Sequence, residues 1–374
     1  MSAVLLRAPR PSSRSGRVRA ARLTDLVALG DLSRLCHSPE ARGDGAVRSL
    51  GLPVSASTIG VFSLFRLPLG AFRPHDRLYV YDEDRKLHGF LRVERDTQRD
   101  EWTIVELDAV GAADAGDIRY RLVQHFLRDG VKGGAARFHV ACKDAGGNVE
   151  LFMQNGFARY GEERILYRPP DAPLPEPLAP EAAQAAGIRP AVPLDALALS
   201  RLYALATPPP VARLEAYRLP DWERQGREWR VPRSSLSPIL RFADVEAYVQ
   251  EARPSSAGRR SKAAPAAQPG ELVAFLQVGL AKERQPHYLK LIARPDHDPS
   301  SLIAYGLGVV AQANARGRSD GGPEASVVCP VRTYESPVDR RLEETGFTYL
   351  ETVTLLMKET LVRVAEPAMV PATR

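Results

Sequence analysis

One pattern occurs twice in this chain, as NVELFMQNGFARYGEERILYR at residues 148–168 and as PVDRRLEETGFTYLETVTLLMK at residues 337–358. Each stretch predicts a short helix, then a Gly-Phe pair, then a strand with alternating side chains. The two glycines, Gly156 and Gly346, lie a whole domain length apart, whereas solenoid repeats recur every roughly 20–50 residues. The repeat therefore predicts one α/β domain present twice, with any site at equivalent places in both copies.

Length and composition fit a globular protein. The chain has 374 residues, of which 44% are hydrophobic and 26% are charged. At roughly 150 residues per domain, this length predicts two or three domains. We expect no membrane partner, because no apolar run reaches the roughly 18 residues of a membrane span. The longest candidate, residues 54–72, is interrupted by polar residues, proline and glycine, which predicts a buried helix and loop.

The cysteines and histidines indicate neither a disulfide framework nor a metal site. Cys36, Cys142 and Cys329 lie far apart, with no CxxC motif and no histidine cluster beside them. The seven histidines show no metal-ligand spacing such as HExxH. This usage fits a reducing compartment, and we expect a cytoplasmic location.

The net charge of +6 is concentrated in two basic clusters, one before Asp25 and one within residues 253–262. Such clusters suit a nucleic-acid-binding arm or an arginine-rich transit peptide. Neither cluster contains aromatic residues that stack on bases. We therefore interpret both as solvated segments and do not expect nucleic acid as a partner.

Proline, glycine and charge set the predicted boundaries. We expect a disordered tail at 1–16, a first domain at 17–168, a proline-rich linker at 169–186, a second domain at 187–364 with a flexible loop at 253–270, and a tail at 365–374. The linker prediction rests on its six prolines and on the lack of a helical apolar stripe.

The order of elements is the same in both halves. The first half begins with a strand at 18–21 and a helix capped by Thr24. Two strands flank an Asp-rich turn at 82–84, and a third strand reads EWTIVELDAV. A long helix then begins near Asp117 and ends before Gly130, followed by a strand, a short helix and the last strand.

This order, β-α-α-β-β-β-α-β-α-β with Gly-Phe after the last helix, resembles the GNAT superfamily of N-acetyltransferases in both halves. The resemblance implies an α/β (α+β) fold of two tandem domains, each a mixed, mostly antiparallel sheet flanked by helices. It implies an N-acyltransferase that uses acetyl-CoA or another acyl-CoA and a small-molecule or protein amine as acceptor. In that family the strand before the long helix splays from its neighbour and holds the pantetheine of the cofactor.

The loop after that strand wraps the pyrophosphate in the family, with the consensus R/Q-x-x-G-x-G/A. Its glycines let backbone N–H groups approach the phosphates at the helix N-terminus. The resemblance implies cofactor-binding roles for Ala109, Val110, Gly111, Gly116, Asp117 and Ile118 in the first half and for Ile292, Ala293, Ser300 and Ser301 in the second. Both loops are degenerate, because Asp114 and Asp298 stand where the Arg or Gln is expected. Alternatively, Asp117 and Asp298 are ordinary helix-capping acids.

The candidate general bases are Glu106 and Asp108, which lie two residues apart and so share one face of a strand. Alternatively, they are a solvated strand face or partners of Arg92 and Arg95. The matching strand of the second half carries Lys290 and no acid.

The resemblance also implies where a proton donor would stand, because many family members have a tyrosine four residues before the Gly-Phe glycine. Phe152 and Leu342 stand there in the two halves, and neither donates a proton. Tyr334, just before the last helix, is the remaining candidate for the second half.

Two functions from different classes remain open. The first is an acyl-CoA-dependent N-acyltransferase with one working site, placed in the first half, where the carboxylates are. The second is a GNAT-like fold without catalysis that serves as a binding or regulatory module. An unrelated two-domain α/β protein is a third interpretation, since a fold alone does not define a function.

Overall fold

The structure is a computed structural model, and it describes residues 16–37, 76–96, 98–110, 115–170, 172, 178–224, 231–240, 242–252, 270–281, 285–317 and 326–360. The two predicted tails, residues 54–72 and the predicted loop at 253–270 lie outside the described residues, except for the end positions 16 and 270. No helix in the described ranges is long and apolar enough to cross a membrane.

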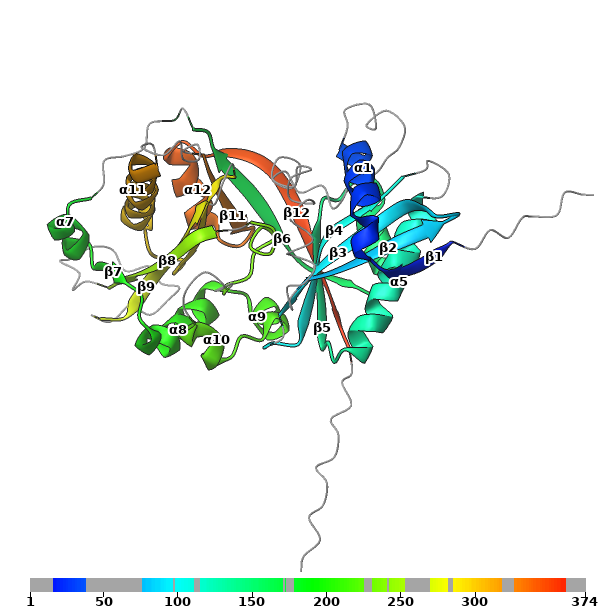
Figure 1. Cartoon of the computed structure of the whole chain (residues 1–374). Helices are drawn as coiled ribbons and strands as arrows, with labels where there is room; N and C mark the ends of the chain where they lie inside the picture. The colour runs from blue at the N-terminus through cyan, green and yellow to red at the C-terminus, as the bar shows by residue number, and fades with distance from the viewer. Residues whose placement is uncertain are drawn as a thin grey trace, which may run out of the picture.

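The first half follows the predicted order of elements (Figure 1). It contains β1 (Arg17–Ala20), η1 (Leu23–Asp25), α1 (Leu26–His37), β2 (Asp76–Glu83), β3 (Lys86–Asp96), β4 (Glu101–Ala109), α5 (Ala115–Lys132), β5 (Arg137–Cys142), α6 (Asn148–Gln154) and β6 (Ala158–Arg168). The helices α1 and α5 pack on opposite faces of the sheet, because alternate residues of a strand point to opposite sides. Val80 and Phe90 pack against α1, whereas their neighbours Tyr79 and Leu91 belong to the core under α5.

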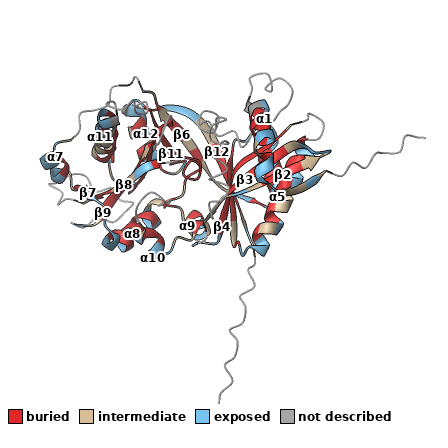
Figure 2. Ribbon diagram, in the orientation of Figure 1, coloured by how far each residue is buried: buried red, intermediate tan, exposed pale blue. Residues whose placement is uncertain are grey.

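The second half repeats this order. It contains β7 (Ile188–Pro190), η3 (Pro193–Asp195), α8 (Ala196–Ala206), α9 (Pro209–Glu215), α10 (Leu219–Glu223), β8 (Phe242–Glu251), β9 (Leu272–Ala281), β10 (His287–Ala293), α11 (Ser300–Gly317), β11 (Val327–Arg332), α12 (Ser336–Glu344) and β12 (Thr348–Glu359). The buried residues concentrate along the strands in the middle of the molecule (Figure 2).

The repeated ending is confirmed in both halves as helix, glycine and strand. Gly156 follows α6 with φ of 80°, and Gly346 follows α12 with φ of 88°. This left-handed conformation strains any residue with a Cβ, so glycine is required where each helix stops and the chain turns into a strand.

The described strands form one 12-stranded sheet in the order β1-β2-β3-β4-β5-β12-β6-β11-β10-β9-β8-β7. Within it, β4 pairs with β5 and β10 with β11 in parallel, and the other neighbouring strands are antiparallel. The predicted fold class, two tandem units with mixed, mostly antiparallel sheets flanked by helices, is confirmed.

The sequence repeat does not predict how the two halves join. The last strand of the first half, β6, lies between β12 and β11, which both come from the second half. The last strand of the second half, β12, lies between β5 and β6 of the first half. Each half therefore completes its sheet with the final strand of the other.

One local prediction is wrong, and the predicted linker contains a short helix. The helix α5 does not end before Gly130 but continues to Lys132. A Cβ at Gly130 would lie 2.3 Å from the Phe138 ring, so glycine lets this ring pack directly on the helix. Part of the predicted linker is helical, because α7 (Pro180–Ala185) forms where Pro180 at the first turn is followed by a glutamate, three alanines and a glutamine.

Candidate functional site

The parallel strands β4 and β5 diverge partway along their length. They pair from Glu101–Arg137 to Ile104–Val140, and beyond this point β4 continues to Ala109 without β5 beside it. The divergence starts at a β-bulge, because Glu106 pairs with Arg92 of β3 and Ile104 with Val93, which leaves Val105 without a partner. A bulge bends and twists its strand, and such distortions are frequent next to active sites.

Backbone groups of β4 face this opening. The N–H of Val110 donates to the carbonyl of His88 on β3 at 2.8 Å. Since backbone groups alternate in direction along a strand, those of Leu107 and Ala109 point to the opposite edge, where pairing with β5 has stopped. Of the two predicted cofactor-binding residues here, Ala109 therefore has backbone groups free to face a ligand, and Val110 has committed its N–H to the sheet.

Glu106 and Asp108 are both buried on the same face of β4. Oε2 of Glu106 accepts a hydrogen bond from Nε of Arg92 at 3.1 Å, so the predicted Arg92 partnership is confirmed. Among the described residues no donor reaches Oε1 of Glu106. Asp108 is paired with Phe90 of β3, which packs against α1, so both carboxylates lie on the α1 side of the sheet. Burial raises the pKa of the Cys36 thiol on α1, and Asp108 and Glu106 add to the shift.

A buried cation approaches the same opening from the α5 side. Arg119, on the second turn of α5, is 3% exposed and donates through Nη2 to Oδ1 of Asn148, the first residue of α6. Asn148 is itself fixed, because its Nδ2 donates to the carbonyl of Lys143 at 3.3 Å. Burial lowers the pKa of the Arg119 guanidinium, while Asp108 on β4 and Cys142 at the end of β5 oppose the shift.

The equivalent opening in the second half is bridged. The strands β10 and β11 pair at His287–Val327 and Tyr288–Val328 and then diverge, and the pairing of β10 with β9 has no bulge. Lys290 crosses the gap: its Nζ lies 3.0 Å from Oε2 of Glu335 and 3.3 Å from the carbonyl of Pro330 on β11. Counted back from the last strand residues, Ala109 and Ala293, Lys290 occupies the place of Glu106.

The helix that follows each diverging strand begins differently in the two halves. Gly116 of α5 borders open space, since a Cβ there would meet nothing within 4 Å. Asp117 forms an exposed ion pair with Arg121 at 2.7 Å. In the second half Asp298 accepts a hydrogen bond from the N–H of Ser300 at 3.0 Å and pairs with Arg341. The helix-capping alternative is therefore confirmed for Asp298, whose carboxylate accepts from the first N–H of α11.

The other predicted cofactor-binding residues are committed to the protein. Ile118 packs in the core under α5, and Ile292 and Ala293 pack in the cores beside α8 and α11. Ser300 bonds to Asp298, and Oγ of Ser301 lies 3.0 Å from Nε2 of Gln250, which donates to it. Gly111 lies outside the described residues.

Tyr334 is not brought together with the carboxylates of β4. It lies between β11 and α12, and its charged neighbours Arg332, Glu335 and Glu215 all belong to the second half. Burial raises the pKa of Tyr334, so its phenol stays protonated. Phe152 and Leu342, at the position of the family tyrosine, are fully buried core residues.

A buried charged cluster between the halves was not predicted from the sequence. Glu101 at the start of β4 lies 2.8 Å from Arg99, 3.2 Å from Arg137 and 2.6 Å from Arg233. Burial alone would raise the pKa of Glu101, but Arg233 and its other cationic neighbours bring it well below its usual range. Arg233 and Glu101 are far apart in the sequence, so no local pattern announces this contact.

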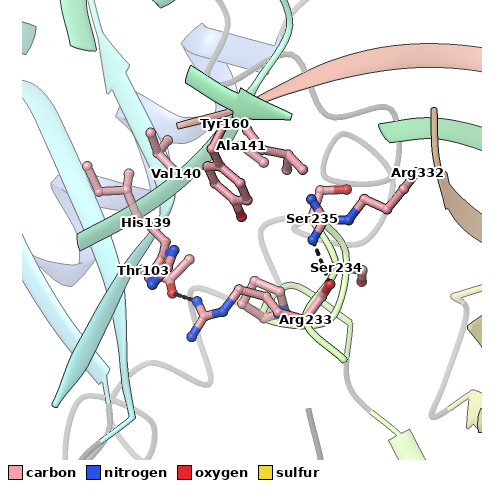
Figure 3. A pocket seen from close by; sticks show the side chains of 12 residues that line it. Thr103, His139, Val140, Ala141, Tyr160, Arg233, Ser234, Ser235 and Arg332 are labelled. Atoms are coloured by element: carbon pink, nitrogen blue, oxygen red, sulfur yellow. Dashed lines mark hydrogen bonds between the residues drawn. The ribbon is translucent and has the colours of Figure 1, made fainter. Parts of the chain in front are cut away.

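A small cavity lies beside this cluster (Figure 3). Its volume is about 20 Å³, roughly enough for one water molecule. Tyr160 points into the space, with His139 on one side and Ser235 and Arg332 on the other. On the other side of the cavity, Arg332 forms two buried ion pairs, one with Glu163 at 3.0 Å and one with Glu215 at 2.7 Å. None of the predicted site residues lines this cavity.

Two halves that each carry a diverging parallel strand pair, followed by a long helix and a helix-glycine-strand ending, define the GNAT acetyltransferase fold. The structure of a GCN5-related N-acetyltransferase from Sphaerobacter thermophilus is similar to this chain, with 16% identity, a TM-score of 0.51, and coverage of 92% of this chain and 95% of that one. A tandem GNAT protein from the clavulanic acid biosynthesis pathway is 13% identical with a TM-score of 0.49, covering 92% and 98% of the two chains.

At this level of identity the first similarity shows the fold alone, and the predicted GNAT-like fold is confirmed. A scan of protein-family models finds no match to this chain, and a sequence search of curated proteins finds none either.

Proposed function

We propose that this protein is an acyl-CoA-dependent N-acyltransferase with one working site, in the opening between β4 and β5. The observation that carries the proposal is the bulge at Val105, which opens the sheet beside a buried carboxylate oxygen of Glu106 that no described donor reaches. A buried acceptor without a donor is costly, and a substrate amine supplies that donor.

Three features of the first half fit an acyl-CoA. The backbone groups of Leu107 and Ala109 face the opening and can pair with the amides of pantetheine. Gly116 leaves room at the N-terminus of the 18-residue helix α5, where N–H groups and the helix dipole favour phosphate. Every residue of β4 is buried, so a thioester bound along this strand would be shielded from bulk water.

The reaction follows from these positions. Glu106, assisted by Asp108, accepts a proton from the acceptor amine as the amine nitrogen forms a bond to the thioester carbonyl carbon. The N–H groups of β4 at the opening donate to the carbonyl oxygen as negative charge develops on it. The bond from carbon to sulfur then breaks, and CoA leaves as its thiolate.

The second half is proposed as a non-catalytic partner. Lys290 and Glu335 bridge the gap between β10 and β11, and the Asp298 carboxylate occupies the start of α11. An acyl-CoA there would have to break a buried ion pair and approach a carboxylate with its phosphates. The alternative of a wholly non-catalytic module is favoured by Phe152, which cannot donate a proton to the leaving thiolate.

The test uses the full chain, because the exchange of β6 and β12 prevents separation of the halves. Calorimetry with acetyl-CoA is expected to show one site, and Glu106→Gln is expected to retain binding while turnover of an amine acceptor falls about 10²- to 10⁴-fold. The matched control is Lys290→Met with Glu335→Gln, at the equivalent place in the second half, which is expected to keep wild-type turnover. No binding up to millimolar acetyl-CoA refutes the enzyme and leaves the non-catalytic module.

A further inference from the structure

We propose that Arg119 is a catalytic residue that stabilises the CoA thiolate as it leaves. This inference deepens the proposed function and rests on it. The chemistry requires such a group, because aminolysis of a thioester expels a thiolate, and the described part of the opening offers no acid on the α5 side that donates a proton to it.

Arg119 lies on the α5 face of the sheet, opposite the face that carries the proposed base. Asp108 is paired with Phe90 of β3, which packs against α1, so Glu106 and Asp108 lie on the α1 side of β4 and the amine whose proton they accept attacks from that side. In the tetrahedral intermediate the sulfur and the amine nitrogen occupy different corners of the same carbon. A sulfur that departs away from the amine leaves on the α5 side of the opening, where Arg119 donates to Asn148 and where Asp108 and Cys142 act on its charge.

The contacts of Arg119 leave it able to bind an anion. Its Nη2 donates to the neutral amide oxygen of Asn148, and among the described residues no acceptor reaches its Nε. Arg119 is nine-tenths buried or more, so the field of its charge is weakly screened within the opening. The anionic neighbour of Arg119 is Asp108, which acts on its charge, whereas Lys290 in the second half forms an ion pair with Glu335 at 3.0 Å.

Asn148, which binds Arg119, lies on the same helix as Phe152, the residue at the position of the family's tyrosine proton donor. Asn148 and Phe152 are four residues apart on α6 and share one face of the helix. The guanidinium therefore binds α6 one helical turn before Phe152, whose side chain offers no proton. A fixed cation stabilises the thiolate without giving up a proton, and the thiolate takes a proton from water after release.

The decisive measurement is the pKa of the CoA thiol when CoA is bound to the full-length protein. Ultraviolet absorbance of the thiolate, followed over a pH series, gives this value directly. The protein's own thiols do not interfere, because burial raises the pKa of Cys36, Cys142 and Cys329. A free alkyl thiol titrates near pH 8.5, and a neighbouring arginine is expected to lower the value in wild type by at least about one unit.

Arg119→Gln removes the charge and keeps a hydrogen bond to Asn148. We expect it to return the bound thiol to its free pKa and to slow single-turnover acyl transfer about 10²-fold. It is also expected to leave unchanged the affinity for desulfo-CoA, the analogue without sulfur. The matched control is Arg128→Gln, an exposed arginine on the same helix, which is expected to behave as wild type.

The outcomes separate the two proposals. If wild type binds neither CoA nor desulfo-CoA, the proposed function fails, and the role of Arg119 fails with it. If both bind and the thiol has the same pKa in wild type and Arg119→Gln, only the role of Arg119 is overturned. Should the variant not fold, the wild-type titration still decides, because a bound thiol at its free pKa contradicts an adjacent guanidinium.

Discussion

Lowering the pH is expected to destabilise the fold through one buried histidine, His139 on β5. Its ring is 3% exposed, and Nε2 lies 3.4 Å from Oε2 of Glu101, which is long for a hydrogen bond. Burial, with a contribution from Arg233, lowers the pKa of His139 to about 4, below the ordinary value of 6.5. The unfolded chain therefore binds a proton at a higher pH than the folded one does.

The sign and size of the effect follow from proton linkage. Because the folded pKa is the lower one, stability is lost as the pH falls from about 6.5 to about 4, where the unfolded state alone gains the proton. Between pH 7 and pH 5 the calculated loss is about 2 kcal/mol, and the full shift corresponds to about 3 kcal/mol. The low pKa of Glu101 acts in the same direction, but at pH values below the ordinary pKa of a carboxyl group.

Urea denaturation followed by tryptophan fluorescence at pH 7 and pH 5 measures this loss in wild type and in His139→Gln. The variant has no titrating ring, so we expect it to lose about 2 kcal/mol less than wild type over the same interval. Equal losses in the two proteins would show that His139 is already protonated in the folded state or is exposed, and would refute the reasoning.

Three further predictions concern packing and backbone geometry, and all are measured by thermal and urea unfolding. Gly346→Ala places a Cβ at φ of 88° and is expected to cost about 1–2 kcal/mol; no loss would contradict the left-handed turn. Gly130→Ala forces the Phe138 ring away from α5 and is expected to lower the free energy of unfolding by about 1–3 kcal/mol. Gly134→Ala is the comparison: a Cβ there meets no neighbour, so this variant measures only the cost of a positive φ. Arg332→Met leaves Glu163 and Glu215 buried without their cation, at a cost of about 3–5 kcal/mol, and a neutral result would show that water reaches them.

Local features of the fold were predictable from the sequence. The Gly-Phe pairs marked the ends of α6 and α12 because glycine is needed at a left-handed turn. The spacing of Glu106 and Asp108 located both on one strand face, since side chains alternate along a strand. Asp298 was predictable as a helix cap from its place two residues before Ser300, where α11 begins.

Contacts between distant parts of the chain were not predictable in this way. Lys290 contacts Glu335 and Arg119 contacts Asn148, although the partners are far apart in the sequence and no periodic pattern links them. The exchange of β6 and β12 was hidden for a different reason. Both strands follow a Gly-Phe pair and have alternating side chains, so either one fits the position of the other in the sheet. Sequence periodicity therefore does not distinguish them.

The exchanged strands also govern how the chain can be built. Both neighbours of β6, namely β11 and β12, come later in the sequence, and one edge of β5 waits for β12 as well. A growing chain therefore holds open strand edges until its last strand, residues 348–359, has been made. Open edges are templates for aggregation. We therefore expect a product truncated before residue 348 to aggregate, because β12 closes the sheet for both halves together.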